Sequence, residues 1–285
     1  MKKALFMTLL LTVTGMTAQD IAVNGRITDE NGEAVEYATI GVPGTAYGTL
    51  SGIDGCFSLT LPQECRDTLV ASHVSYGDTK IPSIVYMNGG DTLTVTMHSR
   101  QLGELVVYNG KRKKGKLMGK GMRVPGAATS WSMGSLGCEV GSIIEVEQTF
   151  EVDEIRFRTL HNTIEHARLS VNIYSMDESN GIFSNILHRP IYIDIPAENE
   201  KREHTTAPNE RVFLAPGSYF VAVKLVDGKS DSLRNKNILF PLYLKSSYIR
   251  KGAADTLEKI PVNLGLQITG DFYKEHTHRK VPEIY

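Results

Sequence analysis

The run from Val23 to Tyr76 restricts the fold more than any other part of the sequence. Short alternating segments, rich in β-branched and aromatic residues, are separated there by turn-forming glycines. Asn31 and Gly32 suit the positive φ angles of a tight hairpin, and Asp54 with Gly55 marks a second turn. Strands at this spacing predict a small antiparallel β-sandwich.

The segments in this region follow one another as strands with one buried face. In Cys56–Leu61, for example, Phe57, Leu59 and Leu61 alternate with polar residues. The expected strands are Ile21–Thr28, Ala34–Val42, Tyr47–Thr49, Cys56–Leu61, Thr68–Tyr76 and Thr92–Met97.

The same residues resemble the carboxypeptidase-regulatory-like domain of exported Gram-negative proteins, which also occurs at the N-termini of TonB-dependent outer-membrane receptors. The resemblance covers residues 21–98, and its ordered motifs are Gly25–Glu33, Tyr37–Thr45, Gly48–Thr49, Asp54–Leu59 and Ser75–Gly77. It implies a seven-stranded, transthyretin-like sandwich. It implies no zinc peptidase, because the family is an accessory domain, and the sequence has no H-x-x-E pair.

Residues 1–18 have the pattern of a secretory signal peptide. Lys2 and Lys3 precede the apolar run Ala4–Val13, which is too short to span a bilayer. We therefore expect an exported protein, located in the periplasm, in the outer membrane or at the cell surface of a Gram-negative bacterium.

Three cysteines, Cys56, Cys65 and Cys138, follow this segment. An extended strand beginning at Cys56 would carry Cys65 too far away for a disulfide, which needs Cα atoms within about 7 Å. We expect three unpaired structural thiols. A metal site is not expected, because no C-x-x-C pair occurs.

A basic, glycine-rich segment follows the first domain, which we assign to residues 19–108. Residues 109–127 show almost no β-pattern and are expected to form a flexible linker. The cations Lys111, Arg112, Lys113 and Lys114 also suit a surface that binds phosphates, acidic glycans or anionic lipid. The formal net charge of −1 gives no general reason to expect nucleic acid as a partner.

Residues 128–285 alternate again and predict a second all-β domain, most simply a jelly-roll-like sandwich of two sheets. Its segments Glu139–Ile144, Arg168–Tyr174 and Asn185–Leu187 resemble the C-terminal half of some exported, uncharacterised bacterial proteins that carry the regulatory-like domain. The alternating segments are Ser142–Val146, Glu154–Arg158, Arg168–Tyr174, Ile191–Ile195, Ser218–Leu225 and Leu264–Ile268.

Trp131 is the sole tryptophan of the sequence. It has two interpretations: core packing, which is the default for a sandwich, or one ring of an aromatic platform for sugars. Tyrosines of the second domain that could complete such a platform are Tyr174, Tyr192, Tyr219, Tyr243 and Tyr248.

No nucleophile elbow, P-loop or dinucleotide fingerprint occurs, so neither an enzyme nor a cofactor is expected. The first hypothesis is a non-catalytic cell-envelope protein that binds or assembles with an envelope protein or glycan, with peripheral association with the outer membrane. The second is a carbohydrate-binding accessory protein that acts through the C-terminal sandwich. The third is a hydrolase with two opposed carboxylates in a cleft.

Overall fold

The computed structural model describes residues 20–88, 92–100, 111–119, 121–177, 182–229 and 236–274. The expected signal peptide at residues 1–18 lies outside this part of the chain. Within the described ranges, no helix is long and apolar enough to cross a membrane.

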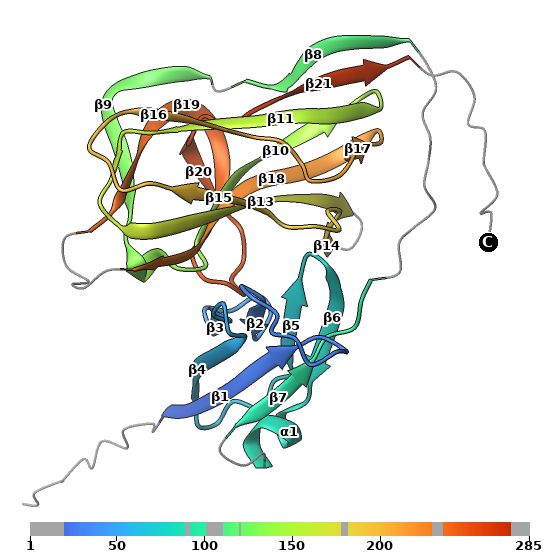
Figure 1. The fold of residues 1–285 in the computed structure, drawn as a ribbon, viewed down its shortest axis with the longest axis vertical. Helices are drawn as coiled ribbons and strands as arrows, with labels where there is room; N and C mark the ends of the chain where they lie inside the picture. Colours follow the sequence, from blue (N-terminus) through green and yellow to red (C-terminus); the bar gives the residue numbers. More distant parts are fainter. Residues whose placement is uncertain are drawn as a thin grey trace, which may run out of the picture.

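An N-terminal sandwich is built from seven strands in two sheets, with the orders β4-β1-β7 and β3-β2-β5-β6. It forms the lower body in Figure 1. Its elements are β1 (Asp20–Thr28), β2 (Thr39–Gly41), β3 (Gly48–Leu50), β4 (Cys56–Pro62), β5 (Leu69–His73), β6 (Tyr76–Ile81), the helix α1 (Ser83–Asn88) and β7 (Leu93–Thr96). The seven-stranded sandwich implied by the resemblance is confirmed.

Local turn chemistry and strand alternation explain this sandwich. Asp29 Oδ1 accepts hydrogen bonds from the backbone N–H groups of Asn31 and Glu33, both at 2.9 Å, and Gly32 has a φ of 82°. These contacts close the predicted hairpin turn. Alternate residues of β1 and β4, among them Ile27 and Leu61, are fully buried in the core between the two sheets.

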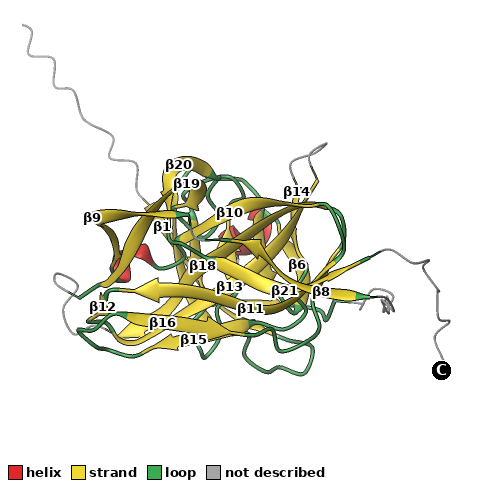
Figure 2. Ribbon diagram, turned by 90° about the horizontal axis from the view of Figure 1, so that it is seen from above, coloured by secondary structure: helices red, strands yellow, loops and turns green. Residues whose placement is uncertain are grey.

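A C-terminal sandwich of nine-stranded and five-stranded sheets lies above it in Figure 1. Figure 2 shows that helix is confined to short segments. The larger sheet contains β9 (Met122–Trp131), β10 (Glu139–Val146), β12 (His161–Asn162), β13 (Glu165–Asp177), β14 (Ile182–Asn185), β15 (Ile191–Ile195), β18 (Gly217–Lys229), β19 (Ile238–Arg250) and β20 (Glu258–Asn263). The smaller contains β8 (Arg112–Met118), β11 (Phe150–Thr159), β16 (Arg202–Thr206), β17 (Phe213–Leu214) and β21 (Gln267–Tyr273), and a 3₁₀ turn, η1 (Met133–Ser135), follows β9.

The core of the C-terminal sandwich fills the space between its two sheets. Phe157 of the smaller sheet and Phe240 of the larger are both almost fully buried, with ring centroids 6.4 Å apart. Val221, Val223 and Leu225 point alternate side chains of β18 into the same core. The predicted all-β class is therefore confirmed for both halves.

The segment expected to be a linker is largely strand, and the expectation of a flexible connector is wrong for it. β8 pairs antiparallel with β21 along Arg112–Met118, and β9 pairs with β19. Gly115 lies against the ring of Phe272, where a Cβ would collide with the ring. A basic segment can be a strand here because the strand it pairs with, and that strand's neighbour, supply carboxylates.

The two sandwiches are in direct contact. Val74, directly after β5, belongs to the core cluster of the C-terminal sandwich. The backbone N–H of Gly44 donates to the carbonyl oxygen of Ala254 at 2.7 Å. Arg100 Nη1 donates to the carbonyl oxygen of Asn185 at 2.6 Å, which ties the chain after β7 to the end of β14. The sheet β3-β2-β5-β6 thus faces the larger sheet of the C-terminal sandwich (Figure 1).

Candidate functional site

A polar row crosses the larger sheet on the face that meets the N-terminal sandwich. Arg250 of β19, Glu139 of β10, Lys224 of β18 and Ser170 of β13 occupy successive register positions on four neighbouring strands. The next residues along these strands point to the opposite face because side chains alternate in a strand. On that face lie the core residues Val140, Val171, Val223 and Ile249.

Glu139 lies at the centre of this row and is fully buried. Its Oε1 accepts hydrogen bonds from Asn172 Nδ2 at 2.9 Å and from Tyr174 Oη at 3.0 Å. Its Oε2 lies 3.2 Å from Arg250 Nη1. The carboxylate is thus paired with one guanidinium and with two neutral donors, as a buried charge requires.

Lys224 is buried beside this pair, with 7% of its surface exposed. Its Nζ donates a hydrogen bond at 2.9 Å to Thr39 Oγ1 of β2, in the other sandwich. Burial lowers the pKa of Lys224, and the nearby carboxylate of Glu139 opposes that shift. The row contains two cations, Arg250 and Lys224, and one anion, Glu139. Arg250 already pairs with that anion.

A pocket of ≈ 360 Å³ opens next to Lys224, between the two sandwiches. This volume falls within the range of small-molecule sites, about 300–1,000 Å³. The N-terminal sandwich contributes Tyr37, Thr39, His73, Tyr76 and Asp78, and the C-terminal sandwich contributes Ser170, Asn172, Tyr174, Tyr192 and Lys224, among other lining residues.

His73 lines this pocket and has a buried ring nitrogen without a partner among the described residues. Its Nδ1 accepts a hydrogen bond from the backbone N–H of Ser75 at 3.2 Å, so the neutral ring carries its proton on Nε2. Nε2 is buried and makes no hydrogen bond to the described residues. Burial, reinforced by the positive charge of Lys224, lowers the pKa of His73 to about 4, so the ring is neutral at pH 7.

Aromatic and charged contacts at the pocket rim fix the two sandwiches together. Tyr37 Oη donates to Asp227 Oδ2 at 2.9 Å. The ring of Tyr37 meets that of Tyr192 edge to face, with centroids 5.3 Å apart and an angle of 84°. Arg168 lies over both rings, 6.0 Å from the first centroid and 5.7 Å from the second. These contacts join the two walls of the pocket.

Residues 23–107 match the CarboxypepD_reg-like domain family. The N-terminal sandwich is a CarboxypepD_reg-like domain. This match agrees with the family resemblance that the sequence shows over residues 21–98. The chain is also similar to the TonB-dependent receptor SusC of Bacteroides thetaiotaomicron, 33% identical over 133 residues, which are 44% of this chain and 13% of the receptor. The chain therefore spans a small fraction of that relative.

Similar solved structures are remote. One contains the cysteine protease and lectin-like domains of Cwp84, a surface layer associated protein of Clostridium difficile, with 10% identity over 53% of this chain and 37% of that chain, and a TM-score of 0.34. Another is of carbohydrate-binding modules from the β-sandwich superfamily, with 10% identity over 85% of this chain and 97% of that chain, and a TM-score of 0.21. Similarity at this level carries no argument about function.

Trp131 does not belong to an exposed aromatic platform, and that hypothesis is wrong. The side chain is 4% exposed at the end of β9, and its ring packs 4.9 Å from that of Phe240 in the core. Tyr219 and Tyr243 are buried as well. Tyr174 and Tyr192 both line the pocket between the two sandwiches, away from Trp131.

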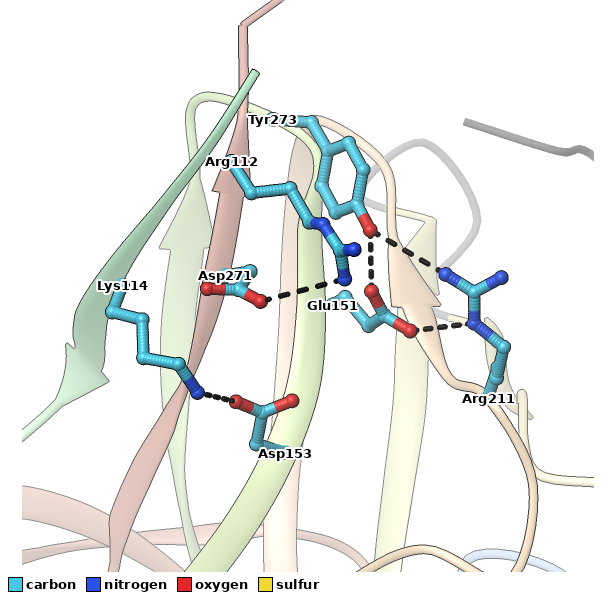
Figure 3. Close-up of polar contacts among 7 residues, drawn as sticks. All are labelled: Arg112, Lys114, Glu151, Asp153, Arg211, Asp271 and Tyr273. Atoms are coloured by element: carbon cyan, nitrogen blue, oxygen red, sulfur yellow. Dashed lines mark hydrogen bonds and ion pairs between the residues drawn. The ribbon is translucent and has the colours of Figure 1, made fainter. Parts of the chain in front are cut away.

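The basic residues of β8 lie on the far side of the C-terminal sandwich from that pocket (Figure 1). Figure 3 shows their carboxylate partners: Lys114 Nζ lies 3.1 Å from Asp153 Oδ2, and Arg112 Nη1 lies 3.9 Å from Asp271 Oδ2. Lys111 and Lys113 are exposed. The surface therefore alternates cations with anions, and the five residues proposed from sequence do not form one site.

Carboxylates surround β8 because they lie on its partner strand and on the next strand of the sheet. Glu151 of β11 accepts from Arg211 Nε at 2.6 Å and from the hydroxyl of Tyr273 (Figure 3). These hydrogen bonds lower the pKa of Glu151. A sequence pattern shows the cations of β8 as a run, whereas their partners Asp153 and Asp271 come from two other strands, β11 and β21.

The described part of the chain contains no group of three or more His, Cys, Asp or Glu side chains that could hold a metal ion. The three cysteines are free, with Cys56 exposed and Cys65 and Cys138 buried, as predicted. Burial raises the pKa of Cys138 to about 11, so this thiol is not a nucleophile at neutral pH.

Proposed function

We propose that the protein is a non-catalytic, exported module of the cell envelope that binds or assembles with an envelope protein or glycan. One observation carries the proposal: the CarboxypepD_reg-like domain is docked on the polar face of a second sandwich and encloses a pocket there. The pocket walls come from both halves, so the two act as one binding unit. An envelope location is supported by similarity to part of a TonB-dependent receptor.

The pocket chemistry favours binding over hydrolysis. A glycosidase uses two opposed carboxyl groups. Among the residues that line this pocket, Asp78 is the single carboxylate, and it is exposed and accepts a hydrogen bond from Ser72 Oγ. Glu139 lies behind the pocket, where its oxygens are engaged by Asn172, Tyr174 and Arg250.

Affinity capture from native envelope extracts tests this function. The tagged full chain is compared with the variant Arg100→Ala, which lacks the side chain that ties Asn185 to the CarboxypepD_reg-like domain. We expect the full chain to retain a defined envelope protein or glycan, and the variant to retain less. Equal recovery of background material by the full chain and by an unrelated exported β-sandwich would contradict the proposal.

A second candidate function is carbohydrate binding, with the pocket in place of Trp131 as the binding surface. Tyr76 and Tyr192 provide aromatic surface in the pocket. Asn172 and Ser170 provide polar groups there that can form hydrogen bonds with the hydroxyls of a sugar. A glycan array probed with the full chain tests it. Binding to a defined saccharide supports this function. The absence of a signal on every sugar of the array argues for a protein partner.

A further inference from the structure

Lys224, at the pocket between the sandwiches, carries a buried positive charge whose hydrogen-bond partner among the described residues is not a carboxylate. Across the sheet, Arg250 and Glu139 compensate one another, and Lys224 has a neutral hydroxyl, Thr39 Oγ1, as its hydrogen-bond partner. A buried ammonium is unfavourable unless an anion or several acceptors surround it. Asp78, the carboxylate at the pocket, is exposed and hydrogen-bonded to Ser72.

A second buried donor lies in the same pocket. His73 Nε2–H makes no hydrogen bond to the described residues, and His73 and Lys224 are close enough to influence each other electrostatically. An ammonium with donors to spare and a neutral imidazole N–H together match the two oxygens of a carboxylate. A metal cation is disfavoured by Lys224. Arg100 also lines the pocket, but its Nη1 donates to the carbonyl oxygens of Val74, Asn185 and Leu187, whereas a phosphate dianion is usually held by several cationic groups that point at it.

We propose that this pocket binds a sugar carrying a carboxylate, with the carboxylate between Lys224 Nζ and His73 Nε2. Tyr76 and Tyr192 line the pocket and offer apolar ring faces to the C–H groups of the sugar. Ser170, the register partner of Lys224, offers its hydroxyl to the sugar, and the amide oxygen of Asn172, which accepts from Asn185 Nδ2 at 3.1 Å, has a second lone pair for a sugar hydroxyl. The inference deepens the carbohydrate-binding candidate and rests on it.

The position of Lys224 also explains why both halves are needed. Thr39 of the CarboxypepD_reg-like domain holds the ammonium from one side, and the sheet of the C-terminal sandwich supplies it from the other. His73 comes from the first half and Asn172 from the second. A bound sugar acid would therefore contact both sandwiches and strengthen their association.

Calorimetric titration of the full chain with D-glucuronate tests the proposal, with D-glucose and acetate as comparison ligands. We expect glucuronate to bind, glucose to bind weakly or not at all, and Lys224→Met to weaken glucuronate binding on the order of 10- to 100-fold, the range for a hydrogen bond to a charged group. His73→Gln should weaken it less. The matched control is Lys259→Met, which removes an exposed lysine of β20 and should leave affinity unchanged.

Several outcomes would overturn the proposal. Glucuronate that binds Lys224→Met as tightly as the parent chain excludes the carboxylate contact, and acetate that binds as tightly as glucuronate excludes recognition of the sugar. No heat and no thermal shift with glucuronate at 50 mM, a concentration well above about millimolar Kd values, also excludes it. Envelope capture that persists in Lys224→Met would leave the proposed binding function standing while the sugar acid is rejected.

Discussion

Lys224 Nζ donates a hydrogen bond to Thr39 Oγ1 across 2.9 Å, joining two residues 185 positions apart in the chain. The strand position opposite Lys224 is held by Glu139, yet that carboxylate lies 3.2 Å from Arg250. The buried ammonium is thus shared between two sandwiches and is not part of a closed ion pair. Its position links the stability of the protein to its proposed function.

Replacement of Lys224 by methionine should not destabilise the ligand-free protein. Methionine keeps the length of the side chain and removes the desolvated charge, while Glu139 keeps its partner Arg250. We expect the free energy of unfolding to be unchanged or raised by up to about 2 kcal/mol. Urea unfolding measures this, with Lys259→Met as the exposed control; a loss of several kcal/mol would show that the lysine serves the fold.

Replacement of Glu139 by glutamine should have the opposite effect. The variant leaves Arg250 and Lys224 buried on one face without a nearby anion. We expect a loss of about 3–5 kcal/mol, the usual result of breaking a buried ion pair. Adding Lys224→Met to this variant should restore part of the loss, and a double-mutant cycle by urea unfolding measures the coupling. Strict additivity of the two changes would contradict the charge balance described here.

The free energy of unfolding should decrease as the pH is lowered, because of His73. Its pKa is about 4 in the folded protein, below the ordinary value of 6.5, so the unfolded chain binds a proton that the folded chain does not. The contribution is complete above pH 6.5 and is lost as the pH falls toward 4; it amounts to about 3 kcal/mol. His73→Gln should therefore flatten the dependence of the melting temperature on pH between 7.5 and 5.

The control for this measurement is His98→Gln, because His98 is exposed and lies against Glu30 at the surface. The other histidine with a lowered pKa, His204, is present in both variants, so the difference isolates His73. Equal slopes for the parent chain and His73→Gln would mean that the His73 ring is protonated or exposed in the folded state.

Trp131 should matter for stability and not for sugar binding. Its side chain fills the core against Phe240, and truncation to alanine should cost about 3–5 kcal/mol. Trp131→Phe keeps most of the contact and should fold at a lower melting temperature with unchanged affinity for any pocket ligand. Reduced glycan binding in folded Trp131→Phe would restore the platform hypothesis.

Tyr37→Phe should weaken the junction between the sandwiches. It removes the hydrogen bond to Asp227 and keeps the ring contact with Tyr192. A hydrogen bond to a charged acceptor contributes about 1.5–3 kcal/mol, so the urea midpoint should fall, and the two halves should unfold in more separate steps. Tyr47→Phe, at an exposed ring in the first sandwich, is the control and should leave the transition unchanged.

Much of the first sandwich could be predicted from sequence because its turns are local. Asp29 and Gly32 close their hairpin through contacts within four residues, and β4 follows the alternation of Cys56–Leu61 with one residue added. The motifs that carry the family resemblance are the same local features. The short helix α1 was not expected.

The errors concern features that depend on distant residues. β8 does not look like a strand because its lysines are balanced by Asp153 and Asp271 from β11 and β21. Core packing was the default interpretation of Trp131 and is confirmed, but its neighbour Phe240 could not be named from sequence, since strand pairing brings the two together. The pocket was missed for the same reason: His73 and Lys224 belong to different sandwiches. A lysine in the apolar alternation of β18 was the one visible signal.

Nuclear magnetic resonance of the Lys224 side chain tests the central claim most directly. The full chain is labelled with ¹³C-lysine, the Lys224 signal is assigned with Lys224→Met, and its titration is followed with and without D-glucuronate. Burial lowers the pKa of Lys224 in the free protein, and a bound carboxylate should raise it and shift the signal. An unchanged signal and an unchanged pKa at saturating glucuronate would contradict the account.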